Sequence, residues 1–228
     1  MAVNVARYLS LQSVLGENVT LIAVSKMRTA GEIMELFEMG HRDFGENYVQ
    51  ELVEKHLILP ESIRWHYIGH LQSNKVKYII PFVHLIHGVD SFKLLLEINR
   101  QGKKLGKVTD CLLQVHIASE KTKHGLNEAE LDDIVKAFVN CTHNHELDNI
   151  RIRGLMGMAT FTDDKQQVDR EFKLLRSLYE KYAEIELPNF RFTWLSMGMS
   201  DDYTIALANG SNMVRIGSML FGSRPPLI

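Results

Sequence analysis

Short apolar runs recur eight times along the 228-residue chain, and most are separated by segments with helical periodicity. The runs predict strands over residues 21–24, 44–45, 65–68, 84–87, 112–117, 152–158, 190–195 and 213–216. Apolar residues at helical spacing predict helices over 5–15, 30–37, 76–80, 92–100, 131–139, 168–182 and 201–208. Apolar strands that alternate with helices are typical of a parallel sheet with both faces covered.

Eight strands with intervening helices favour an α/β fold of the (β/α)8 TIM-barrel type, with one extra helix at residues 5–15 before the first strand. The competing fold is an open doubly wound sheet, which binds dinucleotides through a glycine-rich first turn. The turn after the first predicted strand reads Ser25-Lys26-Met27-Arg28 and contains no glycine. We therefore predict one barrel domain over residues 1–228.

The charge of the chain excludes some partners. The formal net charge is −2, so no overall positive charge attracts nucleic acid or an anionic membrane. No apolar run approaches the ~20 residues that span a bilayer, and polar residues interrupt residues 1–15, unlike in a signal peptide. The two cysteines, Cys111 and Cys141, do not indicate a disulfide framework. We predict a cytoplasmic protein without a nucleic-acid or membrane partner.

Lys26 lies at the end of the first predicted strand. In a barrel of this type, the carboxyl ends of the strands meet on the face where ligands bind. A partly desolvated lysine amine at such a place is the nucleophile that forms a Schiff base with an aldehyde. The alternative is a lysine that extends its amine to solvent, which is the commoner case for a lone lysine at a strand end.

Two turns rich in small residues follow the last two strands, where (β/α)8 barrels hold phosphate. The first turn begins at Ser196 and includes Met199 and Ser200, and the second is Gly217-Ser218. Backbone N–H groups, hydroxyls and a helix N-terminus all suit a phosphate. Ordinary capping of the helix that follows Ser200 is the alternative, and the next two aspartates would have to point away from a phosphate.

Arg215 interrupts the apolar strand Met213-Val214-Arg215-Ile216. Because a barrel interior rarely holds an unpaired charge, this arginine either pairs with a core acid, faces the helices, or points at an acceptor atom of a ligand. An arginine stays protonated and would hold a pyridine nitrogen in its unprotonated form. The histidines show no metal-binding spacing such as HExxH, so we predict no metal site.

Five motifs together resemble a known family. They are Ala-Val-Ser-Lys26, Phe-Gly-Glu-Asn47-Tyr-Val-Gln, Trp-His-Tyr-Ile-Gly-His-Leu-Gln-Ser-Asn-Lys75, Leu-Ser-Met-Gly-Met-Ser-Asp-Asp202 and Met-Val-Arg-Ile-Gly217, in this order. On these motifs the chain resembles the pyridoxal-phosphate homeostasis protein family, over roughly residues 3–224. Members of this family are single-domain relatives of the alanine racemase barrel, which is called fold type III.

The resemblance implies a Schiff base between Lys26 and pyridoxal 5′-phosphate (PLP), with Arg215 opposite the pyridine nitrogen and Asn47 in the ring pocket. It also implies a phosphate site made by Ser196, Ser200 and the Gly217-Ser218 turn, with Met199 in the first of these turns. The chain departs from the family at Met27-Arg28, where a lysine and a proline are frequent, and at His70, where some members have proline.

The resemblance implies a PLP carrier or buffer that passes the cofactor to apo-enzymes, without catalysis. Arg215 would weaken the cofactor as an electron sink, compared with a carboxylate that protonates the ring. Alanine racemase also uses a tyrosine from an extra β-domain of its partner subunit, and this sequence ends at Ile228. We therefore expect a monomer and no efficient racemase activity.

Two other functions are compatible with the residues. A weak PLP-dependent amino-acid racemase would need a base on the far face of the cofactor, from a loop residue such as His70 or Lys123. A phosphate-binding barrel enzyme without PLP would leave Lys26 without a covalent role. The colour of the purified protein distinguishes the second of these functions from the others.

Overall fold

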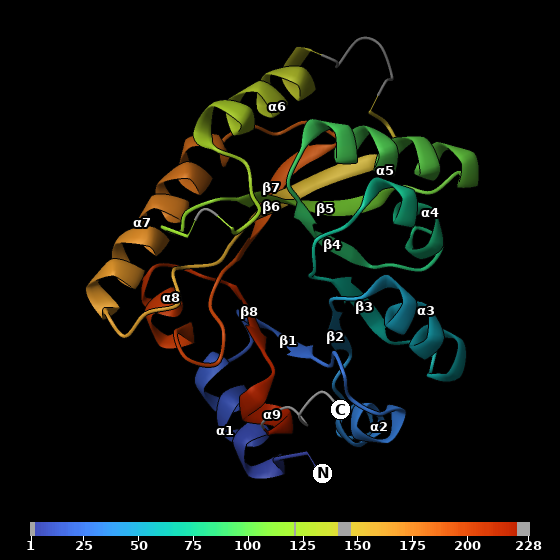
Figure 1. The fold of residues 1–228 in the computed structure, drawn as a ribbon, viewed down its shortest axis with the longest axis vertical. Helices are drawn as coiled ribbons and strands as arrows, with labels where there is room; N and C mark the ends of the chain where they lie inside the picture. The colour runs from blue at the N-terminus through green and yellow to red at the C-terminus, as the bar shows by residue number, and fades with distance from the viewer. Residues whose placement is uncertain (1–2, 121, 141–146, 223–228) are drawn as a thin grey trace.

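The computed structural model describes residues 3–120, 122–140 and 147–222, and its strands close into a barrel (Figure 1). Eight parallel strands are hydrogen-bonded in chain order, and β8 pairs with β1. The prediction of a (β/α)8 barrel is confirmed, and the open doubly wound sheet is excluded.

The boundaries agree with the predicted ones to within a few residues at most ends. The strands are β1 (Thr20–Val24), β2 (Asp43–Glu46), β3 (Arg64–Tyr67), β4 (Leu85–Val89), β5 (Thr109–Val115), β6 (Ile150–Gly157), β7 (Phe190–Ser196) and β8 (Met213–Ile216). The helices are α1 (Val5–Leu15), α2 (Ala30–Glu38), α3 (Val49–Ile58), α4 (Val76–Ile79), α5 (Phe92–Leu105), α6 (Glu128–Asn140), α7 (Lys165–Tyr182), α8 (Tyr203–Ala208) and α9 (Ser218–Phe221), and a 3-10 turn, η1, covers Ser73–Lys75.

The helix α3 and the short α9 were not identified from the sequence. In α3, Leu52 and Lys55 are buried, whereas Leu57 and Ile58 are exposed. The apolar residues of α3 therefore do not form one buried stripe, and its buried lysine contributes nothing to an apolar periodicity. The contacts of α3 with the rest of the barrel therefore stabilise this helix more than an apolar periodicity of its own sequence does.

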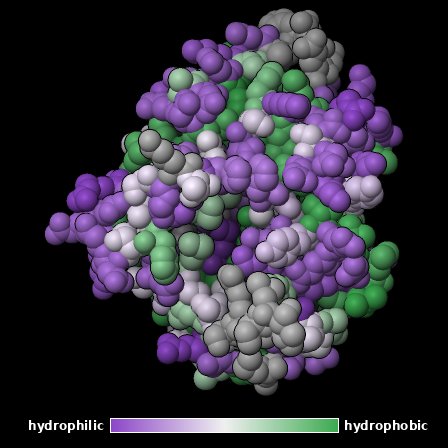
Figure 2. All heavy atoms as spheres, in the orientation of Figure 1, coloured by the Kyte–Doolittle hydropathy of each residue, from purple (hydrophilic) through white to green (hydrophobic). Residues whose placement is uncertain are grey.

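Most buried side chains lie between the barrel and the surrounding helices, and a smaller group fills the barrel itself. The smaller group consists of Ile22, Leu85, Leu112, Met156 and Met213. Because the helices turn their apolar stripes inward, hydrophilic side chains cover the outer surface over α5 and α7 (Figure 2). The barrel interior also holds polar side chains, which lead to the site.

The extra helix α1 lies beside α9 (Figure 1), and the Asn4 N–H donates to the Leu220 carbonyl at 2.8 Å. The Asn4 side chain caps α1 by accepting from the Arg7 N–H at 3.0 Å, and Gly16 ends the helix with φ +63°. This confirms the predicted extra helix before β1. The hydrogen bond between Asn4 and Leu220 connects the start of α1, before the first strand, to α9, after the last strand.

Cys111 is a free thiol that is buried in β5, and burial raises its pKa, so it is unreactive; Cys141 lies outside the described residues. Among the described helices, none has both the length and the apolar composition that crossing a membrane requires.

Candidate functional site

A cavity of about 290 Å³ opens at the carboxyl ends of the strands, on the face that the sequence singled out. Seven of the eight predicted site residues line it: Lys26, Asn47, Met199, Ser200, Arg215, Gly217 and Ser218. The eighth, Ser196, is fully buried in β7 and forms hydrogen bonds inside the barrel. The fold therefore brings together segments that are almost 200 residues apart in sequence.

Lys26 follows β1, where a buried polar network fixes the backbone. The Ser25 hydroxyl donates to Glu46 Oε1 at 2.6 Å, and Lys55 Nζ donates to Glu46 Oε1 and to the Ser25 carbonyl, both at 2.7 Å. Burial raises the pKa of Glu46 to about 7, although the Lys55 ammonium acts in the opposite direction. The network holds the residue before Lys26 in place and so positions the Lys26 backbone.

Asn47 follows β2 and has a buried side-chain oxygen, Oδ1, with no hydrogen-bond partner among the described residues. The backbone of Asn47 is closely packed, because a Cβ added to Gly69 would lie 2.3 Å from the Asn47 carbonyl oxygen. Leaving a buried acceptor unpaired costs about 1–3 kcal/mol. A ligand hydroxyl or N–H in the cavity would satisfy this oxygen.

Arg215 points into the barrel, so the predicted alternative in which it faces the helices is wrong. Its guanidinium donates to the carbonyl and hydroxyl of Ser196 at 2.9 and 2.7 Å, and to the Gly157 carbonyl at 3.0 Å. Burial lowers the pKa of Arg215 to about 10, and the Asp202 carboxylate opposes this shift. Arg215 is therefore charged at neutral pH and is held mainly by neutral acceptors, with no ion pair recorded among the described residues.

The two aspartates of the turn after β7 lie in different surroundings, and one of them, Asp201, lines the cavity. Asp202 precedes α8, and its Oδ1 accepts from the Met199 N–H at 2.5 Å. Asp201 is exposed at the rim. The helix therefore begins at Tyr203, two residues later than predicted, and Ser200 is not its cap. Ser200 is one of the residues that line the cavity.

The second predicted turn lies against the first strand. Gly217 follows β8, and a Cβ added there would come within 3.3 Å of Val24 Cβ in β1. This close approach brings the Gly217-Ser218 turn to the same cavity as Lys26. The Arg28 guanidinium closes one side by donating to the Gly222 carbonyl at 2.6 Å.

The loop residues considered as alternative bases lie outside this cavity lining. Lys123 Nζ donates to the Ala159 carbonyl at 2.6 Å. His70 Nδ1 lies 2.9 Å from Asp90 Oδ2, and its ring stacks on His124 with centroids 4.0 Å apart. Within the described residues, these two histidines and Asp90 form the one recorded group of metal-type ligands. The stacked rings are 14° from parallel, so their in-plane lone pairs do not converge, and we propose no metal there.

Comparison with known proteins places the chain in a family. The family described as alanine racemase, N-terminal domain, matches residues 5–225. A protein of Escherichia coli (strain K12) named pyridoxal phosphate homeostasis protein is 36% identical over 212 residues, which cover 91% of this chain and 87% of that protein. The chain belongs to the pyridoxal phosphate homeostasis protein family. The family resemblance that the sequence motifs indicated is thus confirmed.

Solved structures of similar proteins have the same fold. PipY of Synechococcus elongatus PCC7942 is 35% identical, and its structure with PLP bound has a TM-score of 0.84, covering 95% of this chain and 99% of PipY. An alanine racemase of Clostridium difficile 630 has a TM-score of 0.71 at 16% identity, over 96% of this chain and 56% of the racemase. The racemase likeness shows the barrel fold alone.

Seven lining residues were not among the predicted site residues: Val24, Arg28, Ile68, Met158, Phe161, Asp201 and Gly222. Ile68 and Met158 extend β3 and β6 by one residue, so their place follows from the barrel once the strand ends are known. Phe161 is 88% exposed in a loop after β6. Nothing in its sequence neighbourhood distinguishes it from an ordinary surface aromatic residue.

Proposed function

We propose that this protein binds pyridoxal 5′-phosphate in the cavity at the carboxyl end of the barrel and acts as a carrier or buffer of this cofactor. The observation that supports the proposal most is the meeting of the Lys26 amine, the Arg215 guanidinium and the unpaired Asn47 oxygen in one cavity. The PLP-bound structure of PipY, a family member, supports the same cofactor.

Lys26 is the residue that we assign to covalent attachment. When bound, pyridoxal 5′-phosphate supplies an aldehyde, which reacts with a primary amine and releases one water. Lys26 is half-buried at the end of β1, and its backbone is fixed by the Ser25–Glu46–Lys55 network. A fixed backbone limits the positions that the amine can reach, which favours one attachment geometry.

Arg215 and Asn47 are the residues that we assign to the ring. Arg215 donates hydrogen bonds and accepts none, so it would hold a pyridine nitrogen in its acceptor form. Asn47 Oδ1 would accept from a ring hydroxyl. This donor set suits holding the cofactor more than stabilising negative charge on it, because a carboxylate that protonates the ring is replaced by an arginine.

We assign the residues of the turns after β7 and β8 to binding the phosphate group. Ser200 and Ser218 line the cavity together with Met199 and Gly217, and the two serines offer hydroxyl and backbone N–H donors. Backbone and hydroxyl donors of this kind bind phosphate without a metal. Ser196, which forms its hydrogen bonds inside the barrel, would contribute through Arg215.

We propose a carrier without a catalytic role, because the cavity lining has few proton-transfer groups besides Lys26. Among the described residues that line it, the titratable groups are Lys26, Arg28, Asp201 and Arg215, and none is a tyrosine, histidine or cysteine. The proposal also includes apo-enzymes as recipients of the cofactor. We propose further that residues 1–228 act as one domain, as a monomer and in the cytoplasm.

The visible absorption spectrum of the purified protein tests the proposal. We expect a PLP band that disappears in Lys26→Ala and persists in Lys123→Ala, whose lysine lies outside the cavity lining. Borohydride reduction followed by peptide mass analysis should place one reduced cofactor on Lys26. A protein that stays colourless with added PLP, or a cofactor mass on another lysine, contradicts the proposal.

A further inference from the structure

A chain of four hydrogen bonds runs through the barrel interior from Arg215 to Asp43. Arg215 Nη1 lies 2.7 Å from Ser196 Oγ, and Ser196 Oγ lies 3.3 Å from His87 Nδ1. His87 Nε2 is 3.0 Å from His66 Nδ1, and His66 Nε2 is 3.0 Å from Asp43 Oδ1. The chain begins in the proposed cofactor cavity and ends at a residue near the amino ends of the strands.

The chemistry of its two ends gives the chain one direction. Arginine can only donate, and an ionised carboxylate can only accept. The Arg64 guanidinium binds both oxygens of Asp43, at 2.7 and 2.5 Å, and together with His66 it keeps the pKa of Asp43 well below its usual range. Asp43 is therefore an acceptor, and each group in the chain donates toward it.

This direction fixes the tautomer of both histidines. His66 must carry its proton on Nε2 to donate to Asp43, which leaves Nδ1 as the acceptor for His87. His87 must then also carry its proton on Nε2, and its Nδ1 accepts from the Ser196 hydroxyl. With that hydrogen directed at His87, the lone pairs of Ser196 Oγ face Arg215.

Burial keeps both imidazoles neutral. His66 and His87 are almost fully enclosed, and desolvation lowers the pKa of each. The His84 ring packs against the His66 ring, with ring centroids 5.3 Å apart. The positive charge of Arg64 also lowers the pKa of His66, and that of Arg215 lowers the pKa of His87. A neutral imidazole donates once and accepts once, as a one-directional chain requires.

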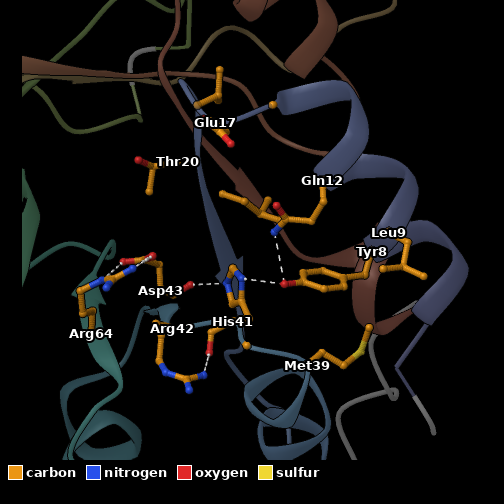
Figure 3. Close-up of a pocket in the computed structure, with 14 residues that line it drawn as sticks. Tyr8, Leu9, Gln12, Glu17, Thr20, Met39, His41, Arg42, Asp43 and Arg64 are labelled. Atoms are coloured by element: carbon orange, nitrogen blue, oxygen red, sulfur yellow. Dashed lines mark hydrogen bonds and ion pairs between the residues drawn. The ribbon is translucent and has the colours of Figure 1, made fainter.

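The far end of the chain opens to solvent in a second concavity. Asp43 and Arg64 line a cavity of about 600 Å³ between α1 and the amino ends of β1–β3. Figure 3 shows the Asp43 carboxylate held by Arg64, with the His41 ring between Tyr8 and the Asp43 backbone. Asp43 therefore lines a cavity that is separate from the proposed cofactor cavity.

We propose that His66 and His87 are positioning residues of the cofactor site. They hold the Ser196 hydroxyl as an acceptor for Arg215, and they make the orientation of Arg215 depend on Asp43 at the opposite end of the barrel. The hydrogen-bond chain itself does not depend on a bound cofactor. Its effect on PLP rests on the proposed function.

The direction of the chain can be measured in the protein without PLP. Histidine labelled with ¹⁵N reports its tautomer by NMR, and His66→Gln and His87→Gln assign the signals. At about pH 7 we expect both rings to be neutral with the proton on Nε2. An Nδ1–H tautomer in either ring, or a charged ring at this pH, overturns the chain.

A pair of His87 variants separates positioning from packing. In His87→Asn the side-chain oxygen can replace Nδ1 as the acceptor for Ser196, whereas His87→Leu fills the space and has no acceptor. We expect the Leu variant to bind PLP about tenfold or more weakly, and the Asn variant to stay within about threefold of the original protein. Equal binding in both variants, or weaker binding in the Asn variant, overturns the positioning role.

The dependence on Asp43 has its own matched control. Asp43→Asn and Glu17→Gln each remove one negative charge from the same cavity, and only Asp43 contacts the chain. In the protein without PLP we expect Asp43→Asn to shift the ¹⁵N signals of His87, and Glu17→Gln to leave them unchanged. An unshifted His87 in Asp43→Asn overturns the coupling. Failure of the original protein to bind PLP would contradict the proposed function and leave these NMR results standing.

Discussion

The Glu51 carboxylate accepts a hydrogen bond from the backbone N–H of Met27, with Oε1 2.5 Å from the nitrogen. Met27 has φ +60°, a left-handed conformation that costs a residue with a side chain about 1–2 kcal/mol. It is the one residue other than glycine with positive φ in the described part of the chain, and it directly follows Lys26. Glu51 therefore holds a strained turn beside the proposed attachment residue.

This strain predicts an unusual order of stability at position 27. In an unstrained helix or strand, a protein with alanine at a given position is more stable than the same protein with glycine by about 0.5–1 kcal/mol. Because glycine adopts positive φ without cost, we expect Met27→Gly to be about 1 kcal/mol more stable than Met27→Ala. Urea unfolding of the two variants measures the difference, and the ordinary order of alanine above glycine would contradict a strained turn.

The buried Glu46 predicts a pH dependence of stability. Its pKa is raised from the ordinary 4.5 to about 7, so the folded protein binds a proton that the unfolded chain releases between these values. The resulting stabilisation is complete below about pH 4.5 and is lost as the pH rises to about 7. We expect the free energy of unfolding to fall by roughly 2 kcal/mol across this window.

A matched pair of variants isolates this contribution. Glu46→Gln cannot titrate and keeps an oxygen for Ser25 and Lys55, so unfolding of this variant should lack that part of the pH dependence. Glu38→Gln, at an exposed position, should keep the slope of the original protein. Equal slopes in the original protein and Glu46→Gln would mean that Glu46 is ionised throughout.

Gly198 lies in the closely packed turn after β7, and we expect this turn to tolerate no larger residue without a loss of stability. Its φ is +97°, and a Cβ added there would lie 2.6 Å from Ala206 Cβ. Gly106 also has a positive φ, of +60°, but no atom lies within 4 Å of an added Cβ. We expect Gly106→Ala to cost about 1 kcal/mol of stability and Gly198→Ala about 2–4 kcal/mol, with weaker PLP binding in the second variant alone. Similar costs in thermal unfolding would show that the turn can relax.

Much of the fold followed from the sequence because the strands of a parallel barrel are apolar runs between helices. Lys26 and Arg215 were found for the same reason: Lys26 follows an apolar strand, and Arg215 interrupts another. The strand ends and the turns after them therefore led to seven of the fourteen residues that line the cavity.

The hydrogen-bond chain behind Arg215 could not be predicted in this way. His66 and His87 lie in the consecutive strands β3 and β4, and each alone resembles an isolated buried histidine. Their role depends on the barrel register, which sets His66 opposite Gly45 and His87 near Ser196. The role that the sequence assigned to Ser196, a direct phosphate contact, stays a prediction, since its hydroxyl is bonded to Arg215 and His87.

Exchanging Arg215 for an acid predicts a change from holding the cofactor to reacting with it. In Arg215→Glu the carboxylic acid can share a proton with the pyridine nitrogen, and a protonated ring withdraws more electron density from an attached amino acid. We expect deuterium exchange at Cα of added alanine to rise at least about tenfold over the original protein. Arg215→Gln removes the same charge without an acidic group, and it should stay near the original rate. Near-UV circular dichroism shows that both variants are folded before the comparison is made. Equal exchange in the two variants would contradict the placement of Arg215 against the ring nitrogen.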